Sequence, residues 1–456
     1  MAKYATINPA TGEQVAEFDV ISDAQARQLT DRAAAAYFPW KSWALADRTA
    51  VLRRMADLHR ERSVELAAIL TLEMGKTTTQ ALGEVALVAN IYEYYADRAA
   101  DFIADEQLTI AGKGTAYVRT EPIGALVGIM PWNYPYYQVA RFVAPNLALG
   151  NTVILKHARN CPQSALAIEE LFHDAGLPAD VYQNAFASAE QISEMIADPR
   201  VQGVSLTGSE RAGSAVGEVA GRHMKKYVLE LGGSDPFIVL EDADLDAAAL
   251  AAAAGRFGNC GQACTASKRF IVLDAVYDSF VAKFIDAVKS FEIGDPTQSG
   301  TKLGPMSSHQ ALEDFDILVQ DAKAKGATVL TGGNRIASPG SFYAATLLAD
   351  VDETMRVFHE ELFGPAGVIY RVKDEESAVE LANNSPFGLS SSIFTADTAR
   401  AERVAAQLDA GMVWINDISR SAPDLPFGGV KGSGVGRELA RFGFNEFANK
   451  KLVRLP

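Results

Sequence analysis

The sequence contains little cysteine and little histidine. Among its 456 residues are three cysteines, Cys161, Cys260 and Cys264, and six histidines. Three is an odd number and too few for a disulfide framework, so we expect a reduced, cytoplasmic protein. The chain has no HExxH pattern and no paired CxxC motifs, and its histidines are scattered. Because such patterns are the ones that hold zinc, we expect no metal site.

Long apolar runs and positive charge are also scarce. The alanine stretch 247–254 is far shorter than the roughly 20 residues that cross a bilayer. The opening MAKYATINPATGEQ has no basic start and no apolar core, so we expect no secretory signal. Lysine and arginine number 42 against 57 aspartates and glutamates, a net charge of −15. Nucleic acid and anionic membranes would repel such a chain, and we expect neither as a partner.

The rest of the composition is typical of a globular protein, with 48% hydrophobic and 22% charged residues. A chain of 456 residues exceeds one ordinary core, so we expect at least two domains. The first hundred residues predict helices: Ser22 is an N-cap for a helix that Pro39 ends, and Gly75 caps a later helix. Two short β-rich runs around Gly112 and Gly114 predict a hairpin.

From residue 124 onward, short apolar runs that end in polar or glycine turns alternate with helical stretches. This alternation predicts βαβ units and parallel sheets, whose ligands bind at the carboxyl ends of the strands. We expect two α/β domains with a boundary near Gly232 and Gly233. The runs fall into two sets: GALVGIM, NTVILK and VQGVSLTG, then RFIVLD, GATVLTGG, GVIYRV and SSSIFT.

Two of the three cysteines lie in GNCGQACTASKR, residues 258–269, among side chains with almost no bulk. Small neighbours leave a thiol accessible and allow backbone N–H groups to approach a reacting atom. Alternatively, Cys260 and Cys264 both fill space in a core, which is common for free cysteine. The residues alone leave both interpretations open.

Three strand ends carry further candidates, each with an alternative role. Glu230 follows the apolar run YVL, and is either a general base with a raised pKa or a salt-bridged strand end. Asn133, in IMPWNYP, is either a donor to an oxyanion or an Asx-turn residue ahead of Pro135. Gly208 and Ser209 stand at a strand-to-helix turn that is suited to a phosphate, without a full glycine fingerprint.

In combination and order, these motifs resemble the NAD(P)-dependent aldehyde dehydrogenase superfamily over essentially the whole chain. The short chain and the LKHA motif are most similar to its succinate-semialdehyde dehydrogenase branch. The resemblance implies an α/β fold with two doubly wound parallel-sheet domains and a small β oligomerisation segment. The motifs are PWNYP, LKHA, LTGS, LELGG, GQACTASKR, EELFGP and PFGGVKGSG.

The resemblance also implies a division of the chain. Residues 1–105 and 122–232 correspond to the dinucleotide-binding domain, and residues 233–434 to the catalytic domain. The segments 106–121 and 435–456 correspond to the oligomerisation segment. Because these two β segments are too short for a core and leave unpaired edges, we expect a homodimer or a dimer of dimers.

The resemblance assigns the catalytic roles. Cys264 corresponds to the nucleophile, Glu230 to the general base, and Asn133 to the oxyanion-binding amide that acts with the backbone N–H of Cys264. These residue types fit attack on an aldehyde, transfer of hydride to a nicotinamide, and hydrolysis of the resulting thioester. Cys260 matches no family role, and we expect it to pack; redox pairing with Cys264 is the alternative.

Further positions correspond to the family's cofactor site. Lys156 matches the residue that holds the adenosine ribose, Ser209 the residue beside the pyrophosphate, and Glu361 and Phe363 the residues at the nicotinamide ribose. The remaining positions expected near the cofactor are Trp132, His157, Gly208 and Leu231.

Arg159 departs from the family pattern and bears on the choice of cofactor. Members that prefer NAD often have a glutamate at this position, which accepts hydrogen bonds from the ribose hydroxyls. An arginine cannot accept, but it suits a 2′-phosphate. We therefore expect NADP as the preferred cofactor, with NAD as the alternative should Arg159 point into solvent.

The substrate is predicted from the segment YYQVARFVAP, a helix expected to end by Pro145. Gln138 and Arg141 share one face of it with Tyr134. An arginine directed into the aldehyde tunnel would pair with a distal carboxylate, and the succinate-semialdehyde branch has a carboxylate-binding residue at this position. Ser421, with Arg420 beside it, is a further candidate ligand. Alternatively, Arg141 forms a salt bridge with a neighbouring domain.

Other functions are weighed against these residues. Glutarate semialdehyde and small hydroxyaldehydes stay open as substrates. A structural protein on this fold would have lost the site, but Cys264, Glu230 and Asn133 are all present. Acyl transfer to coenzyme A needs no base for thioester hydrolysis, and the intact Glu230 favours water as the acceptor.

Overall fold

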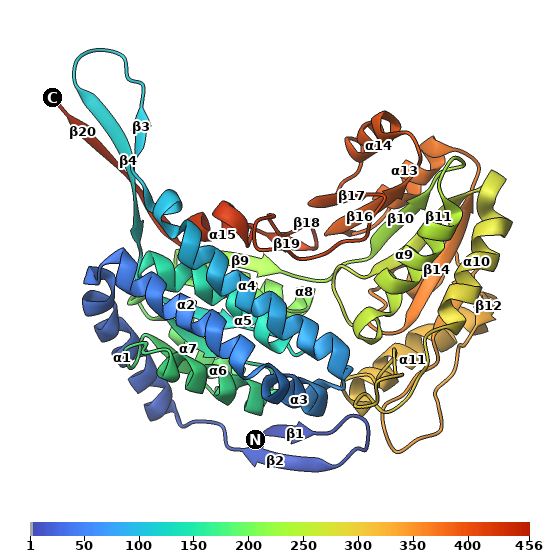
Figure 1. Cartoon of the computed structure of the whole chain (residues 1–456), viewed down its shortest axis with the longest axis horizontal. Coiled ribbons are helices and arrows are strands. Elements are labelled where there is room, and N and C mark those ends of the chain that lie inside the picture. Colours follow the sequence, from blue (N-terminus) through green and yellow to red (C-terminus); the bar gives the residue numbers. More distant parts are fainter. Residues whose placement is uncertain (1–2) are drawn as a thin grey trace.

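The structure, a computed structural model, describes residues 3–456. It has two halves, each built on its own large sheet, and a smaller sheet that projects from one of them (Figure 1). The chain passes from the first large sheet to the second between residues 230 and 235. The α/β fold predicted from the sequence is confirmed. No helix within residues 3–456 has the length and apolar character needed to span a bilayer.

The first half contains a six-stranded sheet, parallel except where its edge strand β19 pairs with β9. The expected runs GALVGIM, NTVILK and VQGVSLTG supply β5, β6 and β8. In spatial order the strands are β19 (Gly434–Val435), β9 (Lys226–Glu230), β8 (Val201–Thr207), β5 (Ala125–Ile129), β6 (Thr152–Lys156) and β7 (Tyr182–Asn184).

Both faces of this sheet are covered by helices, because successive side chains of a strand point to opposite faces. Val127 of β5 packs with α1, α7 and α8, whereas Leu126 packs with the helices of the opposite face. The helices of this half are α1 (Asp23–Ser42), α2 (Leu45–Glu61), α3 (Ser63–Met74), α4 (Thr78–Ile103), α5 (Pro135–Leu149), α6 (Pro162–Asp174), α7 (Ala189–Ala197) and α8 (Glu210–Arg222).

The second half contains a seven-stranded sheet, parallel except for the pair β12 and β13. Its spatial order is β12 (Thr328–Thr331), β13 (Thr346–Ala349), β14 (Ala366–Val372), β11 (Ser267–Leu273), β10 (Asp235–Val239), β16 (Ser390–Phe394) and β17 (Met412–Ile415). Its α-helices are α9 (Leu245–Phe257), α10 (Tyr277–Lys289), α11 (His309–Ala324), α12 (Arg356–His359), α13 (Glu375–Asn383) and α14 (Thr398–Ala405).

The projecting sheet has three antiparallel strands and carries the C-terminus at its tip (Figure 1). Its central strand β4 (Thr115–Pro122) lies between β3 (Glu106–Leu108) and β20 (Ala448–Leu455). The hairpin expected around Gly112 and Gly114 is therefore confirmed. The remaining elements are β15 (Phe387–Gly388), β18 (Val430–Lys431), α15 (Ala440–Glu446) and the short 3₁₀ turns η1 (Gly258–Gly261) and η2 (Asp274–Val276).

Two helix signals are confirmed by the local geometry. The Ser22 side chain accepts from the backbone N–H of Gln25, and the Gln25 side chain accepts from that of Ser22, which forms a capping box. Gly75 ends α3 at a φ of 77°, a left-handed conformation that glycine adopts without a steric cost.

Three expectations for local structure are wrong. The first hundred residues are not only helical, because β1 (Tyr4–Ile7) and β2 (Gln14–Phe18) form an antiparallel pair at the start. Pro39 and Pro145 lie inside α1 and α5 and do not end them. A proline inside a helix removes one hydrogen bond. Trp40 after Pro39 and residues 146–149 after Pro145 are buried, and this packing favours continuation of both helices.

Candidate active site

Cys264 lies in the connection between α9 and β11, where the backbone is held in an unusual shape. Asn259 and Cys260 both have left-handed φ values, 52° and 55°, and Gly261 follows at 69°. Left-handed backbone is uncommon outside glycine and is found often at functional sites. A Cβ at Gly261 would collide with the carbonyl oxygen of Gly364. Close backbone packing therefore accounts for one of the small residues in this stretch.

Two cavities meet at Cys264, and their walls separate two groups of candidates. The first, the Trp132 cavity, has a volume of about 270 Å³ and opens at the carboxyl ends of β5, β8 and β9. The second, the Tyr137 cavity, has a volume of about 340 Å³ and borders the first turn of α5. Cys264 lines both. The residues predicted from the sequence that line the Trp132 cavity are Trp132, Asn133, Gly208, Ser209, Leu231, Cys264, Glu361 and Phe363.

Asn133 is held from both its side chain and its backbone. Its Nδ2 donates to the carbonyl oxygen of Gln262 at 3.1 Å. Its own carbonyl accepts from Lys76 Nζ at 3.1 Å and from Asn259 Nδ2 at 2.9 Å. A primary amide has two N–H groups, so the one not bonded to Gln262 is available for an oxygen atom that forms beside Cys264.

The surroundings of the Cys264 thiol disfavour its ionisation to a thiolate. Burial raises the pKa of Cys264 to about 12, although the positive charges of Arg141 and Lys268 oppose the shift. Lys268 was not expected as a functional residue, yet its Nζ donates to the Cys264 carbonyl at 2.8 Å and pairs with Glu361 at 3.1 Å. Its only sequence signal is its place at the end of the cysteine motif. Cys260 lies in the hydrophobic core of the second half, and its expected packing role is confirmed.

Glu230 is a buried carboxyl at the end of β9. Both of its oxygen atoms lack a hydrogen-bond partner in the described structure, and a Cβ at Gly428 would lie 2.7 Å from Oε1. Burial raises the pKa of Glu230 well above its ordinary value, and the charge of Arg141 opposes this rise. A carboxylate with a raised pKa is a stronger proton acceptor than an ordinary one. Glu230 is not among the residues that border either cavity, so it would need another rotamer to contact a ligand there.

The walls of the Trp132 cavity combine aromatic rings with a helix N-terminus. The rings of Trp132 and Phe363 pack edge to face with centroids 5.5 Å apart. Ser209 is the N-cap of α8, and its Oγ accepts from the N–H of Ala212 at 3.4 Å. Glu361 accepts from the N–H of Gly233 at 3.0 Å. A flat group can lie against the rings, and an anionic group can lie at the helix N-terminus.

Lys156 and Arg159 bring two positive charges to the end of β6. Burial, together with the nearby positive charge of Arg159, lowers the pKa of Lys156 to about 8. Arg159 is exposed. Neither side chain forms a salt bridge with any residue in 3–456. The two cations thus share a region that is suited to an anion.

The cofactor role expected for His157 is wrong as far as its side chain is concerned. The ring is fully buried, with Nε2 at 3.0 Å from the carbonyl oxygen of Pro135 and Nδ1 accepting from the N–H of Ala158 at 2.8 Å. Burial lowers the pKa of His157 to about 4. Because both ring nitrogens are occupied, His157 supports the fold between β6 and α5.

Arg141 is also not where the sequence predicts it. Its side chain is fully buried, and its Nε pairs with the carboxylate of Glu438. Its other donors reach Thr207 Oγ1 at 3.0 Å and the Tyr137 hydroxyl at 3.3 Å. Arg141 is absent from the described lining of the Tyr137 cavity, because these partners occupy its donors. A salt bridge is therefore observed, as in the alternative, but its partner Glu438 follows β19 of the same half. Arg141 contacts the cavity through Tyr137 and through Phe427, whose ring centroid lies 4.4 Å from the guanidinium carbon.

Gln138 and Ser421 do line the Tyr137 cavity, and so does Arg420. The Tyr137 hydroxyl donates to Ser421 Oγ at 2.7 Å. Arg420 is largely exposed and lies 3.4 Å from a carboxylate oxygen of Asp417. The cavity therefore combines a hydroxyl pair with an arginine that is only loosely engaged.

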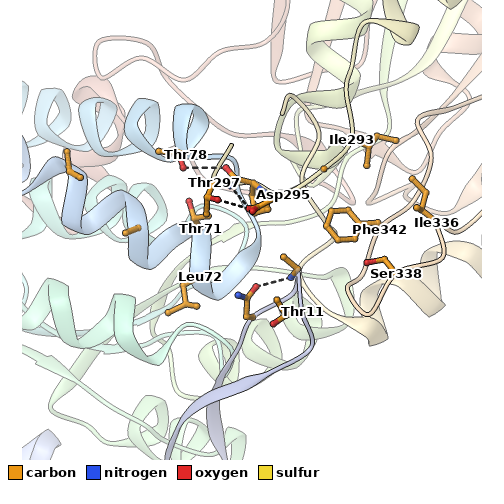
Figure 2. Close-up of a pocket in the computed structure, with 16 residues that line it drawn as sticks. Thr11, Thr71, Leu72, Thr78, Ile293, Asp295, Thr297, Ile336, Ser338 and Phe342 are labelled. Carbon is orange, nitrogen blue, oxygen red and sulfur yellow. Dashed lines mark hydrogen bonds between the residues drawn. The ribbon is translucent and has the colours of Figure 1, made fainter. Parts of the chain in front are cut away.

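A larger cavity of about 860 Å³ lies elsewhere, between α3 and the loops around residues 295 and 338 (Figure 2). Its lining is mostly apolar and includes one carboxylate, Asp295, whose Oδ1 accepts from the backbone N–H and the hydroxyl of Thr297 at 2.9 and 2.7 Å. No lysine, arginine, histidine or cysteine is among its described lining residues. Volume alone therefore does not mark the chemical site, which is at Cys264.

Comparison with known proteins gives the family of this chain. The model of the aldehyde dehydrogenase family matches residues 2–453. The chain belongs to the aldehyde dehydrogenase family. Among its relatives, the NADP⁺-dependent succinate-semialdehyde dehydrogenase of Deinococcus radiodurans is 54% identical over 451 residues, which cover 99% of this chain and 94% of that protein.

Two solved structures share the fold closely. The succinic semialdehyde dehydrogenase of Streptococcus pyogenes, in complex with NADP⁺, matches with a TM-score of 0.97 and 43% identity, over 99% of this chain and all of that one. The structure of Gox0499, whose cofactor and substrate selection has been studied, matches with a TM-score of 0.99 and 47% identity over the full length of both chains. The resemblance read from the motifs is thereby confirmed, and the chain is an enzyme of this family.

Proposed function

We propose that the protein oxidises succinic semialdehyde to succinate, with NADP⁺ as the hydride acceptor. The observation that carries this proposal is the position of Cys264 at the junction of the Trp132 cavity and the Tyr137 cavity. One sulfur atom can then contact an aldehyde on one side and lie beside a nicotinamide ring on the other. The substrate and cofactor named for the relatives from D. radiodurans and S. pyogenes support the choice of both.

In the first half of the reaction, the Cys264 thiolate forms a bond to the aldehyde carbon, and the carbonyl oxygen takes up negative charge. The free N–H of the Asn133 amide and the backbone N–H of Cys264 are the donors for that oxygen. NADP⁺, when bound, accepts the hydride that leaves the former aldehyde carbon. The carbon remains bonded to Cys264 as a thioester.

In the second half, water attacks the thioester and the Cys264 sulfur leaves. Glu230 is the proposed base that takes a proton from this water, since its raised pKa makes the carboxylate a stronger base than an ordinary one. The balance is one aldehyde, one NADP⁺ and one water converted to one carboxylic acid, one NADPH and one proton.

The groups around the Trp132 cavity fit NADP⁺ along its length. The nicotinamide and its ribose would lie against Phe363 and Glu361, and the pyrophosphate at the N-terminus of α8 beside Ser209. Lys156 and Arg159 would hold the adenosine ribose and its 2′-phosphate, because the two cations lie near each other and neither forms a salt bridge within residues 3–456. NAD⁺ lacks this phosphate and should bind less well.

The far end of succinic semialdehyde is an anion, and the Tyr137 cavity offers a receptor for it. The hydroxyls of Tyr137 and Ser421 are the proposed direct ligands, and Gln138 lines the same wall. Arg141 donates to the Tyr137 hydroxyl and polarises its O–H, whose single proton, donated to Ser421 Oγ in the free enzyme, would turn to the carboxylate when the substrate binds. Arg420 adds a positive charge, because its ion pair with Asp417 is long, at 3.4 Å, and leaves the guanidinium largely exposed.

The test is the rate of NADPH formation by the purified protein with succinic semialdehyde, with NAD⁺ and butanal as the alternative cofactor and aldehyde. We expect the highest kcat/KM with succinic semialdehyde and NADP⁺. Equal use of butanal would contradict the carboxylate receptor but keep the dehydrogenase. A preference for NAD⁺ would contradict the role of Lys156 and Arg159, and no turnover of any aldehyde would contradict the function itself.

We also propose that the enzyme is a cytoplasmic homodimer or dimer of dimers. Strand β20 pairs only with β4 in the described structure, so one edge of eight residues is open, and Leu452 and Leu455 on it are exposed. A second copy can cover such an edge. The same projecting sheet supports a division into 1–105 with 122–232, 233–434, and 106–121 with 435–456. Light scattering on the purified protein tests the assembly, and a monomer would contradict it.

A further inference from the structure

We infer that the buried ion pair Lys76–Glu84 positions the oxyanion-binding amide of Asn133 and the first turn of α5. The inference rests on the proposed aldehyde oxidation, and it assigns positioning roles to two residues that no sequence motif marks. Lys76 follows the cap of α3, and Glu84 lies in the second turn of α4. Both line the Tyr137 cavity. Their side chains are fully buried and form a salt bridge.

All three N–H bonds of the Lys76 ammonium have a described neighbour. One partner is the Glu84 carboxylate, and a second is the carbonyl oxygen of Asn133 at 3.1 Å. The third is the ring of Tyr134, whose centroid lies 3.7 Å from Nζ, within the range of a cation–π contact. Two of the three partners therefore belong to the segment that carries the oxyanion-binding amide.

Glu84 holds the other side of the same segment. Its Oε1 accepts from the backbone N–H groups of Tyr136 and Tyr137, at 2.9 and 3.1 Å. These groups lie in the first turn of α5, where N–H groups have no partner within the helix. The residue at the N-cap, Tyr134, makes no side-chain cap. A carboxylate from α4 therefore serves as the cap and also complements the helix dipole.

The pair thus clamps the backbone on both sides of Pro135. Lys76 fixes the carbonyl of Asn133, two residues before this proline, and Glu84 fixes the N–H groups of the two residues after it. The direction of the Asn133 side chain depends on this backbone. A donor to an oxyanion must be placed to within a fraction of an ångström, because misplacement by about 1 Å can cost about 100-fold in rate.

The turn that carries Lys76 is itself held in place from the second half of the molecule. A Cβ at Gly75 would lie 2.6 Å from Pro305 Cγ and 3.0 Å from Pro9 Cγ, so the backbone is tightly enclosed there. The N–H of Thr78 donates to the carbonyl of Pro296 at 2.9 Å. Lys76 therefore extends from a fixed support toward Asn133.

Stability alone does not account for the pair. Removing two charges from water is costly, and replacement of a buried ion pair by apolar side chains of similar volume is often neutral or stabilising. Here both charged groups also bond backbone atoms of the segment from Asn133 to Tyr137. Placement of those atoms is the feature that an apolar pair could not reproduce.

The test is a double-mutant cycle that combines Lys76→Met with Asn133→Ala and measures NADPH formation in a single turnover. In the native background, we expect Lys76→Met to slow this step about 10- to 100-fold. In the Asn133→Ala background, the same substitution should slow it less than about 3-fold, because the amide that Lys76 positions is gone. NADP⁺ affinity should be unchanged in both.

The matched control is Lys225→Met, which also removes a lysine bonded to two backbone carbonyls, those of Asp198 and Val201. It should lower thermal stability without a change in the single-turnover rate. An equal loss from Lys76→Met in both backgrounds would overturn the inference, because a merely structural effect does not depend on Asn133. A rate equal to that of the native enzyme would also overturn it.

Two further measurements keep the result decisive. Should Lys76→Met not fold, Glu84→Gln enters the same cycle, with the same expected non-additivity, and Lys76→Arg should restore part of the rate. Inactivity of the native protein toward every aldehyde would contradict the proposed function. Native activity with additive variants would contradict only the positioning role.

Discussion

The side-chain N–H of Asn133 donates to the backbone carbonyl of Gln262, at 3.1 Å. Gln262 lies two residues before Cys264, so the amide and the nucleophile are anchored to the same short loop although 131 residues separate them in sequence. We expect Asn133→Ala to lower kcat about 100- to 1000-fold, the usual effect of losing one oxyanion donor. Steady-state kinetics with succinic semialdehyde measures the change, and a loss below about tenfold would contradict the assignment.

The Cys264 thiol should react slowly with alkylating agents in the cofactor-free enzyme. Because burial raises its pKa to about 12, only a small fraction is thiolate at neutral pH. Alkylation by iodoacetamide should therefore accelerate about tenfold for each pH unit between about pH 7 and pH 9. Mass spectrometry of the cysteine peptide measures the rate, with Cys264→Ser as the control for labelling of Cys161 and Cys260. A rate independent of pH would contradict the raised pKa.

Glu230→Gln should separate the two halves of the reaction. The thioester can still form, so a single turnover of NADPH should remain within about tenfold of the native rate. Steady turnover should fall about 100- to 10,000-fold, because glutamine cannot take a proton from water.

The pH dependence of turnover tests the same residue. A general base works only when deprotonated, and burial raises the pKa of Glu230 above its ordinary value. Turnover in the native enzyme should therefore fall on the acid side at a pH above the ordinary carboxyl range. The Glu230→Gln variant should lack this dependence. Rapid mixing and steady-state assays measure both, and an unchanged acid limb in the variant would assign it to another group.

Arg159→Glu should shift the cofactor preference toward NAD⁺. Reversal of charge beside Lys156 repels a 2′-phosphate and supplies an acceptor for ribose hydroxyls. We expect kcat/KM with NADP⁺ to fall about 10- to 100-fold and that with NAD⁺ to fall far less or to rise. Arg403→Glu is a matched control, since it reverses an exposed arginine of α14 that lines neither cavity. The same loss with both cofactors would contradict the 2′-phosphate site.

Arg141→Ala should destabilise the enzyme strongly. It leaves the Glu438 carboxylate buried beside the space of the removed guanidinium, with Ser205 Oγ, at 3.0 Å, as its remaining side-chain donor among residues 3–456. Breaking a buried ion pair in this way typically costs about 3–5 kcal/mol of unfolding free energy. The double variant Arg141→Met with Glu438→Leu should recover part of this loss. Urea unfolding measures both, and a loss below about 1 kcal/mol would show that the pair contributes little.

The sequence predicts those features that depend on residues close to one another along the chain. Ser22 with Gln25 and the left-handed Gly75 are recognisable because a cap needs only residues adjacent along the chain. The strand ends at Asn133 and Glu230 follow from apolar runs that stop at a polar residue. The order of the motifs, which is the same as in the aldehyde dehydrogenase family, then predicts that Cys264 and the residues lining the Trp132 cavity belong to one site.

Features that depend on distant partners were not predictable. Arg141 occupies the motif position of a substrate ligand, but its guanidinium forms an ion pair with Glu438, almost 300 residues later in the sequence. His157 occupies a motif position next to the expected cofactor site, but its ring is buried against the carbonyl of Pro135 and is not available to a cofactor. Lys76 carries no functional pattern, and its contact with Asn133 arises only when the turn between α3 and α4 meets α5.

The junction of the two cavities at one sulfur has a consequence for inhibitor design. A molecule that occupies both chambers at once must pass directly beside Cys264. A flat head for the Trp132 side and an anionic tail for the hydroxyls of Tyr137 and Ser421 could therefore be joined through an electrophilic carbon, which the linker would present to the thiol. The two ends of the molecule would provide selectivity, and the covalent bond between its electrophilic carbon and the Cys264 sulfur would make the inhibition irreversible.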